Sequence, residues 1–169
     1  MRRTIEDRKQ ELIIGLKAAR IDIFNSIAQL PVERLGEVFL GEWSIKDLLA
    51  HLVGWDFTNL QAIQDILSGR PPAFFRYYDQ DWRSYNKSLV EKYKIEPFSE
   101  LLAKAQASHQ EFVSFLEALS AEQLVNGKTR SESGRTVTVR NLLQAETRDE
   151  QTHAMQIRTK FHPPASSAV

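Results

Sequence analysis

Residues 139–157 read VRNLLQAETRDEQTHAMQI, and their apolar side chains recur at the spacing of an amphipathic α-helix. On a helical wheel of about 100° per residue, one sector roughly 120° wide holds both apolar and ionisable side chains. These side chains are Val139, Leu142, Leu143, Glu146, Asp149, Glu150, His153 and Ile157. The apolar first two turns identify this sector as the face that points to the core. The next two turns therefore direct carboxylates and an imidazole inward.

Three more segments repeat the apolar period of a long helix: residues 4–30, 44–69 and 98–119. Thr4 followed by Asp7, and Ser44 followed by Asp47, are N-capping patterns that mark where the first two helices begin. Four amphipathic helices around one core predict an all-α protein with a four-helix bundle fold.

A long aromatic-rich connection joins the second and third helices. Its aromatic residues, with arginines between them, are Phe74, Phe75, Tyr77, Tyr78, Trp82, Tyr85 and Tyr93, with Arg76 and Arg83. Part of the connection, about residues 79–93, is expected to form a short helix. The aromatic side chains are expected to cover the end of the bundle or to line a pocket. Aromatic and arginine side chains also stack on nucleic-acid bases, an alternative that the charge balance of the chain disfavours.

The other connections and the chain ends carry weaker signals. Residues 126–134 are polar and rich in Gly and Ser, so they are expected to be loop, after which Thr138 can cap the last helix. His162 is expected to be solvated, and residues 163–169 have too little hydrophobicity to fold and predict a disordered tail. Because no linker or repeat divides the rest, residues 1–162 are expected to form a single domain.

The composition excludes several classes of protein. Lys plus Arg and Asp plus Glu each number 22, so the formal net charge is zero and gives no general attraction to nucleic acid or to an acidic membrane. The absence of cysteine excludes disulfides, thiolate metal sites and a cysteine nucleophile. The N-terminus is charged where a signal peptide needs an apolar run, and no stretch approaches the ~20 apolar residues of a membrane span. We therefore expect a cytoplasmic protein with no nucleic-acid or membrane partner.

The polar patch on the last helix needs compensation, because burying unpaired charges is costly. Asp149 and His153 stand at positions i and i+4 and can ligate one cation together. His51, on the flank of the second helix, is the natural third ligand. An ion-pair or hydrogen-bond network with Arg or Lys from neighbouring helices, or a water-filled cleft, explains the patch as well. His109 lies in the apolar stripe of the third helix, either as a core histidine or as a wall of the same pocket.

Several segments resemble the DinB-like (DinB/YfiT) superfamily of four-helix bundles. Residues 41–55, GEWSIKDLLAHLVGW, resemble the start of its second helix, where a Trp-Ser-x-x-Asp opening leads into Leu-x-x-His. Residues 138–157 are similar to its last helix, in which His-x-x-x-His is followed shortly by Gln-Ile. Residues 67–72, LSGRPP, and the helix after them resemble the branch of ClbS and DfsB relatives. The resemblance covers most of residues 5–160.

The resemblance implies, residue by residue, a site for one divalent metal ion. His51 matches the first ligand of the family and His153 the third, whereas Asp149 stands where the family usually has a second histidine. A site of two histidines and one carboxylate suits zinc, nickel, manganese or iron. Glu146 and Glu150 are then the candidates for the catalytic base or for the partner that orients a ligand.

For function, the resemblance implies a bacterial homodimer that acts on a small molecule, as a metal-dependent hydrolase or a thiol-dependent transferase. Two alternatives stay open. One is a metal-free bundle of the ClbS type that binds or detoxifies a small compound. The other is a dimeric protein whose buried acids are ion-paired and which has no catalytic activity.

Overall fold

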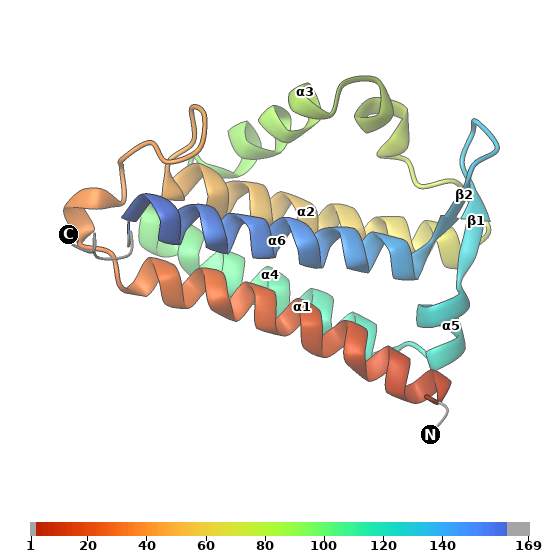
Figure 1. Cartoon of the computed structure of the whole chain (residues 1–169). Coiled ribbons are helices and arrows are strands. Elements are labelled where there is room, and N and C mark those ends of the chain that lie inside the picture. The colour runs from red at the N-terminus through yellow and green to blue at the C-terminus, as the bar shows by residue number, and fades with distance from the viewer. Residues whose placement is uncertain (1–2, 162–169) are drawn as a thin grey trace, which may run out of the picture.

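The computed structural model describes residues 3–161, the side chains of residues 78–80 excepted. Four long helices form the bundle: α1 (Ile5–Ala28), α2 (Ile45–Leu67), α4 (Phe98–Ala118) and α6 (Val139–Phe161). Helix α1 packs along α6, and α2 packs along α4 (Figure 1). The predicted all-α four-helix bundle is confirmed. Among the described residues, no helix is long and apolar enough to cross a membrane.

The predicted helix starts are confirmed by their caps. The Thr4 side chain accepts a hydrogen bond from the Asp7 backbone N–H at 3.0 Å, and the Asp7 carboxylate accepts one from the Thr4 N–H, which completes a capping box. Ser44 and Asp47 form the same arrangement at the start of α2. The Thr138 hydroxyl accepts from the Asn141 N–H and so caps α6 as expected.

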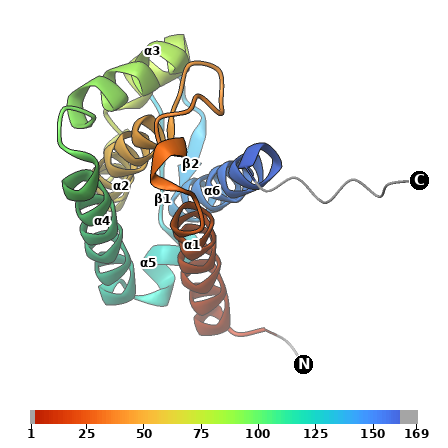
Figure 2. The ribbon, with the colours of Figure 1, turned by 90° about the vertical axis from the view of Figure 1, so that its left-hand side faces the viewer.

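The aromatic-rich connection forms a helix longer than the sequence predicted. Helix α3 spans Phe75–Tyr93 and lies outside the four-helix layer, over α2 (Figures 1 and 2). Its backbone leaves helical geometry at Asp81, where φ is −152° and ψ is 82°. The Asp81 carboxylate accepts hydrogen bonds from the N–H and the hydroxyl of Ser84, so Asp81 caps a second helical segment. The helix is therefore two segments joined at a kink.

The expectation of a loop over residues 126–134 is wrong in part. The chain there forms a short helix, α5 (Ala121–Asn126), and a hairpin of two antiparallel strands, β1 (Lys128–Arg130) and β2 (Thr136–Thr138). Gly134 adopts φ of +80° in the turn, a conformation that favours glycine. Val137 of β2 is buried against the core, so this strand directs one apolar side chain inward. The hairpin lies at one end of the bundle, and the loop between α1 and α2, with the 3-10 turn η1 (Val32–Arg34), at the other (Figure 1).

Buried polar side chains separate the two larger apolar clusters of the core, and a third, smaller cluster forms around Trp55 and Phe74. One cluster gathers around Ile23, Leu49 and Ile157, and the other around Leu16, Phe112 and Leu143. At the level between them, the helices contribute Arg20, Asp56, Asn59, Ser108, Glu146, Glu150 and, closer to one side, His51 and His153. The buried polar side chains therefore lie in the middle of the bundle. His162, expected to be solvated, and residues 163–169, expected to be a disordered tail, lie outside the residues that the structure describes.

Candidate metal centre

The inward polar face of α6 contains most of the residues that the wheel placed there. Glu146, Glu150 and His153 are buried, with Glu150 fully so. The inward orientation expected for Asp149 is wrong in degree, because 51% of its side chain is exposed. Asp149 lies at the edge of the sector, where α6 faces α2 across an open cavity rather than the closed core. His51, expected on a flank, is instead buried, because the Trp43 ring packs on it at 4.8 Å between centroids.

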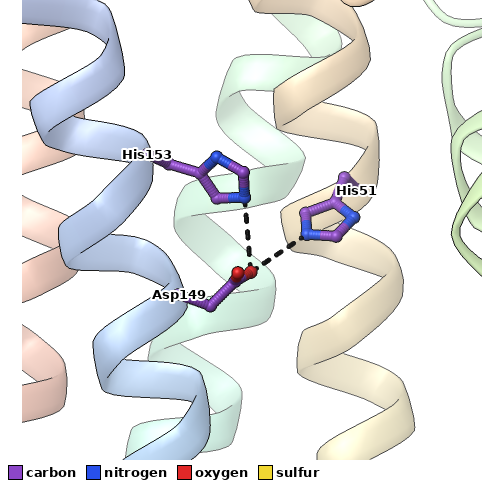
Figure 3. A group of neighbouring side chains, drawn as sticks. All are labelled: His51, Asp149 and His153. Carbon is purple, nitrogen blue, oxygen red and sulfur yellow. Dashed lines mark hydrogen bonds and ion pairs between the residues drawn. The ribbon is translucent and has the colours of Figure 1, made fainter. Parts of the chain in front are cut away.

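Two histidines from different helices converge on one carboxylate oxygen (Figure 3). The Nε2 atom of His51 lies 3.4 Å from Oδ2 of Asp149, and the Nε2 atom of His153 lies 3.3 Å from the same oxygen. One donor atom from each residue lies within 4.8 Å of the other two. The structure therefore brings together the three residues that the sequence suggested as metal ligands.

The two histidines differ in how their second ring nitrogen is held. His153 Nδ1 lies 2.9 Å from Oε1 of Gln156, and because an amide oxygen only accepts, Nδ1 donates to it. The proton that must leave for an ion to bind is therefore the one on Nε2, which faces Asp149. His51 Nδ1 is buried, and no described residue forms a hydrogen bond with it. The ring of His51 is positioned instead by Trp43 and by an edge contact with the ring of His153 at 5.3 Å. Gln156 is thus a site residue that sequence reasoning had not singled out.

The electrostatics of the three residues favour an anionic Asp149 between the two histidines. Burial lowers the pKa of His51, so its imidazole is neutral near neutral pH. Burial opposes the charge of Asp149, but hydrogen bonds from His153 and His51 outweigh it and lower the pKa of that carboxyl. Burial also disfavours a proton on His153, yet the Asp149 hydrogen bond and charge prevail and raise the pKa of His153.

The donor set fits a divalent ion. In a tetrahedral zinc site with bonds of about 2.0–2.1 Å, two ligand atoms lie about 3.3–3.4 Å apart. The two separations between the histidine nitrogens and the Asp149 oxygen, 3.4 and 3.3 Å, match that spacing. Imidazole nitrogen and carboxylate oxygen together suit zinc, nickel, manganese and iron.

The three residues open onto a cavity of about 880 Å³, bounded by the loop before α2 and by α2, α3 and α6. Its walls include Trp43, Trp55 and Phe74, and Glu146 lines it beside the candidate ligands. Asn59 Nδ2 donates a hydrogen bond to Glu146 Oε2 at 2.8 Å. Burial, and then the charges of neighbouring acids, raise the pKa of Glu146 well above its ordinary value. Its environment at the cavity wall therefore favours the protonated form of Glu146.

Glu150 belongs to a different cluster in the core. Arg20 of α1 donates to Oε1 of Glu150 at 2.7 Å and to both carboxylate oxygens of Asp56, and Ser108 also donates to Asp56. Glu150 does not line the cavity, so its geometry favours a role in packing α6 over the catalytic role suggested from sequence. Asp56, His109 and Glu150 also lie within metal-binding distance of one another. In this cluster the positive charge comes from the guanidinium of Arg20, which forms ion pairs with Asp56 and Glu150.

Sequence reasoning had missed Arg20 and Asp56, although one signal was available. Arg20 follows Leu16 by four residues, and Asp56 follows Leu52 by four, so both charged side chains continue an apolar helical stripe. Opposite charges at core spacing on two helices indicate a buried ion pair, although which helix supplies which partner requires the fold.

The sequence pattern of the DinB superfamily matches residues 16–157. This chain belongs to the DinB superfamily. The match extends from within α1 to within α6 and includes the three candidate ligands. No curated protein matches the sequence significantly.

Solved structures of other proteins share this DinB fold at low sequence identity. The colibactin self-resistance protein ClbS, in complex with double-stranded DNA, is 17% identical with a TM-score of 0.75, covering 93% of this chain and 97% of that one. YfiT from Bacillus subtilis, described as a probable metal-dependent hydrolase with an unusual four-helix bundle topology, is 18% identical with a TM-score of 0.66, covering 94% and 89%. The mycothiol-dependent maleylpyruvate isomerase is 14% identical with a TM-score of 0.70, covering 92% of this chain and 63% of that one.

At these identities the similarity of structure shows the fold alone. The DinB fold clearly accommodates different partners, because the ClbS structure contains DNA. The expectation that this DinB-superfamily chain has no nucleic-acid partner therefore finds no support in the comparison.

Proposed function

We propose that this protein is a divalent-metal-dependent enzyme that acts on a small molecule in the cavity beside Trp43. His51, Asp149 and His153 are its metal ligands. The observation that carries the proposal is the convergence of two Nε2 atoms on one Asp149 oxygen, at 3.4 and 3.3 Å, at the wall of that cavity. Three protein ligands with an open position on a cavity are the arrangement of catalytic rather than structural metal sites.

The class of reaction follows from what such a site can do. A divalent ion bound there would act as a Lewis acid and make a water or a thiol easier to deprotonate near neutral pH. Hydrolysis and thiol-dependent transfer are the two reactions that use this chemistry. YfiT, described as a probable metal-dependent hydrolase, and a mycothiol-dependent isomerase both share the fold, which supports hydrolysis and the use of a thiol as the starting points.

Glu146 supplies the proton chemistry in this proposal. Its buried carboxyl holds a proton at the cavity wall and is oriented by Asn59. A protonated carboxyl facing a substrate donates its proton to a leaving group as a general acid, and the resulting carboxylate then accepts a proton as a base. Glu150 contributes indirectly, because its ion pair with Arg20 fixes the turn of α6 that carries Asp149 and His153.

A metal-free cavity protein of the ClbS type is the second candidate. One observation favours it: both histidines form hydrogen bonds or ion pairs with Asp149, so the three side chains also satisfy one another. The cavity would then bind or detoxify a small compound through its aromatic walls. For either function we also propose a homodimer, as the resemblance implies, and a cytoplasmic location, as expected from the sequence.

The metal content of purified protein tests the proposal. We expect about one divalent ion per chain in the wild type by elemental analysis, and loss of that ion in His51→Ala, Asp149→Asn and His153→Ala. Each substitution removes one of the three protein ligands. Water from the open cavity is too weak a ligand to replace it. A wild type that contains no metal after growth with added zinc, manganese, nickel or iron, and that melts at the same temperature in chelator, would favour the metal-free function.

His109→Ala is the matched control. It removes a histidine from the Asp56–Glu150 cluster, the other group of residues within metal-binding distance. We expect this variant to keep the full metal content. Loss of metal in His109→Ala but not in His153→Ala would place the ion in the wrong cluster and contradict the assignment.

A further inference from the structure

The cavity has walls of fixed aromatic rings. Trp55 packs edge-on against Phe74 at 5.6 Å between centroids, with the two ring planes 83° apart. The indole N–H of Trp55 donates to Oδ1 of Asn86 in α3 at 2.9 Å, which ties α3 to α2. Together with Trp43, these rings form an apolar surface whose shape exists before any ligand binds. A cavity of about 880 Å³ lies within the range of small-molecule sites.

The kink in α3 sets a cation at the wall of the same cavity. Because Asp81 caps the second segment of the helix, Trp82 and Arg83 lie in its first turn, and both line the cavity. The Arg83 guanidinium carbon lies 4.9 Å from the centroid of the Trp82 ring. Arginine stacked on an aromatic ring keeps its N–H groups free at the edge of the guanidinium plane for a planar anion.

The other cations of the wall have partners. Lys87 lies 3.9 Å from a Glu91 oxygen, and Lys94 lies 3.8 Å from an Asp47 oxygen. Arg83 forms no ion pair with any side chain that the structure describes. The charge of Arg83 acts on Asp81 from a distance, but both carboxylate oxygens of Asp81 accept hydrogen bonds from Ser84. Arg83 is therefore the cavity cation that is available to a ligand.

We infer that the cavity binds an amphipathic organic anion, with an apolar ring packed among Trp43, Trp55 and Phe74 and a carboxylate held by Arg83. This inference deepens the proposed function and rests on it for the reaction, since the reacting end of the molecule would face His51, Asp149 and His153. Aromatic rings supply affinity through apolar contact, and a charged hydrogen bond supplies selection for the anion. Binding itself depends on the cavity and on Arg83, not on an ion.

Tryptophan fluorescence reports on this site directly, because all three tryptophans of the chain, Trp43, Trp55 and Trp82, line the cavity. We would titrate phenylpropionate and its uncharged analogue phenylpropanol, exciting at a wavelength that phenyl rings do not absorb. Both chelator-treated and zinc-loaded protein would be used. Arg83→Gln removes the proposed anion contact. Lys92→Gln removes one charge from the same helix outside the cavity and is the control.

The expected result is that Arg83→Gln binds phenylpropionate about tenfold more weakly than the wild type and Lys92→Gln do, a loss typical of one charged hydrogen bond. Phenylpropanol should bind all three proteins equally. Equal phenylpropionate affinity in the wild type and Arg83→Gln, or no fluorescence response to either probe, would overturn the inference. A preference for phenylpropionate that appears only with zinc would also overturn it, because the carboxylate would then bind the ion. The metal content of the protein as purified, before chelator treatment or zinc loading, decides the proposed function separately.

Discussion

Arg20 of α1 and Glu150 of α6 form an ion pair at 2.7 Å in which both side chains are fully buried. The same guanidinium binds the two oxygens of Asp56 in α2, at 2.9 and 3.1 Å. One arginine thus compensates two buried carboxylates and joins three helices at the level of the candidate site. A carboxylate buried in this way has no access to water that could replace the guanidinium.

Substitution of Arg20 by leucine should destabilise the protein strongly. Arg20→Leu keeps an apolar stem in the core but leaves Asp56 and Glu150 without a cation, for which the typical cost is about 3–5 kcal/mol. Urea denaturation followed by circular dichroism gives the free energy of unfolding. The control is Arg158→Leu, which removes an exposed ion pair of 2.6 Å with Asp22 between the same two helices. That loss should stay below about 1 kcal/mol, and equal losses in the two variants would contradict the assignment.

The fold could be predicted from sequence because its signals are local. Thr4, Ser44 and Thr138 cap the N-termini of three helices, and the apolar residues at helical spacing identify the faces that pack together. The hairpin was missed because strands of three residues, such as Thr136–Thr138, are shorter than the alternation that identifies a strand. The early start of α3 was missed because Asp81 caps only its second segment.

The candidate site was predictable only in part. The apolar turns of α6 fix its inward face, so the burial of Glu146, Glu150 and His153 followed from the sequence. A helical wheel does not include other elements, however. The burial of His51 under Trp43 depends on the loop before α2, and the exposure of Asp149 depends on the cavity below α3.

Gln156 should strengthen metal binding without touching the ion. Its side-chain oxygen accepts from His153 Nδ1 at 2.9 Å and fixes the tautomer in which Nε2 can ligate. Gln156→Leu removes this acceptor and should weaken zinc binding about 10–100-fold, whereas Gln156→Glu, which keeps it, should retain affinity. Competition with a chromophoric chelator measures the Kd. Gln151→Leu, at an exposed position of α6, is the control, and a Kd of Gln156→Leu equal to that of the control would exclude this role.

Metal affinity should depend on pH through His153. Its pKa is raised from the ordinary 6.5 and that of His51 is lowered from it, so near pH 6.5 His153 carries a proton and His51 does not. An ion must displace that proton, and affinity therefore falls as pH decreases below the pKa of His153, by about tenfold per pH unit for one proton. Above that pKa the affinity should level off. Calorimetry in buffers of different ionisation enthalpy counts the protons released, and release of none near pH 6.5 would contradict the assignment.

Glu146→Gln should make the protein more stable at neutral pH. Burial raises the pKa of Glu146 above the ordinary 4.5, so its contribution to stability is fully present below about pH 4.5 and is lost as pH rises through the folded-state pKa. Glutamine keeps the oxygen that accepts from Asn59 but has no proton to lose. The melting temperature of the variant should therefore equal that of the wild type near pH 4.5 and exceed it by at least ~2 °C near pH 7.5.

The matched control for this substitution is Glu111→Gln at an exposed position of α4, which should change the melting temperature by less than about 1 °C at either pH. A Glu146→Gln variant that is less stable than the wild type at neutral pH would mean that the carboxylate is ionised and has a cationic partner. Greater stability without the acid would show that folding does not require the carboxyl of Glu146, which is consistent with a role in chemistry. Glu146 would then be the first residue of the cavity to test for catalysis once a substrate is in hand.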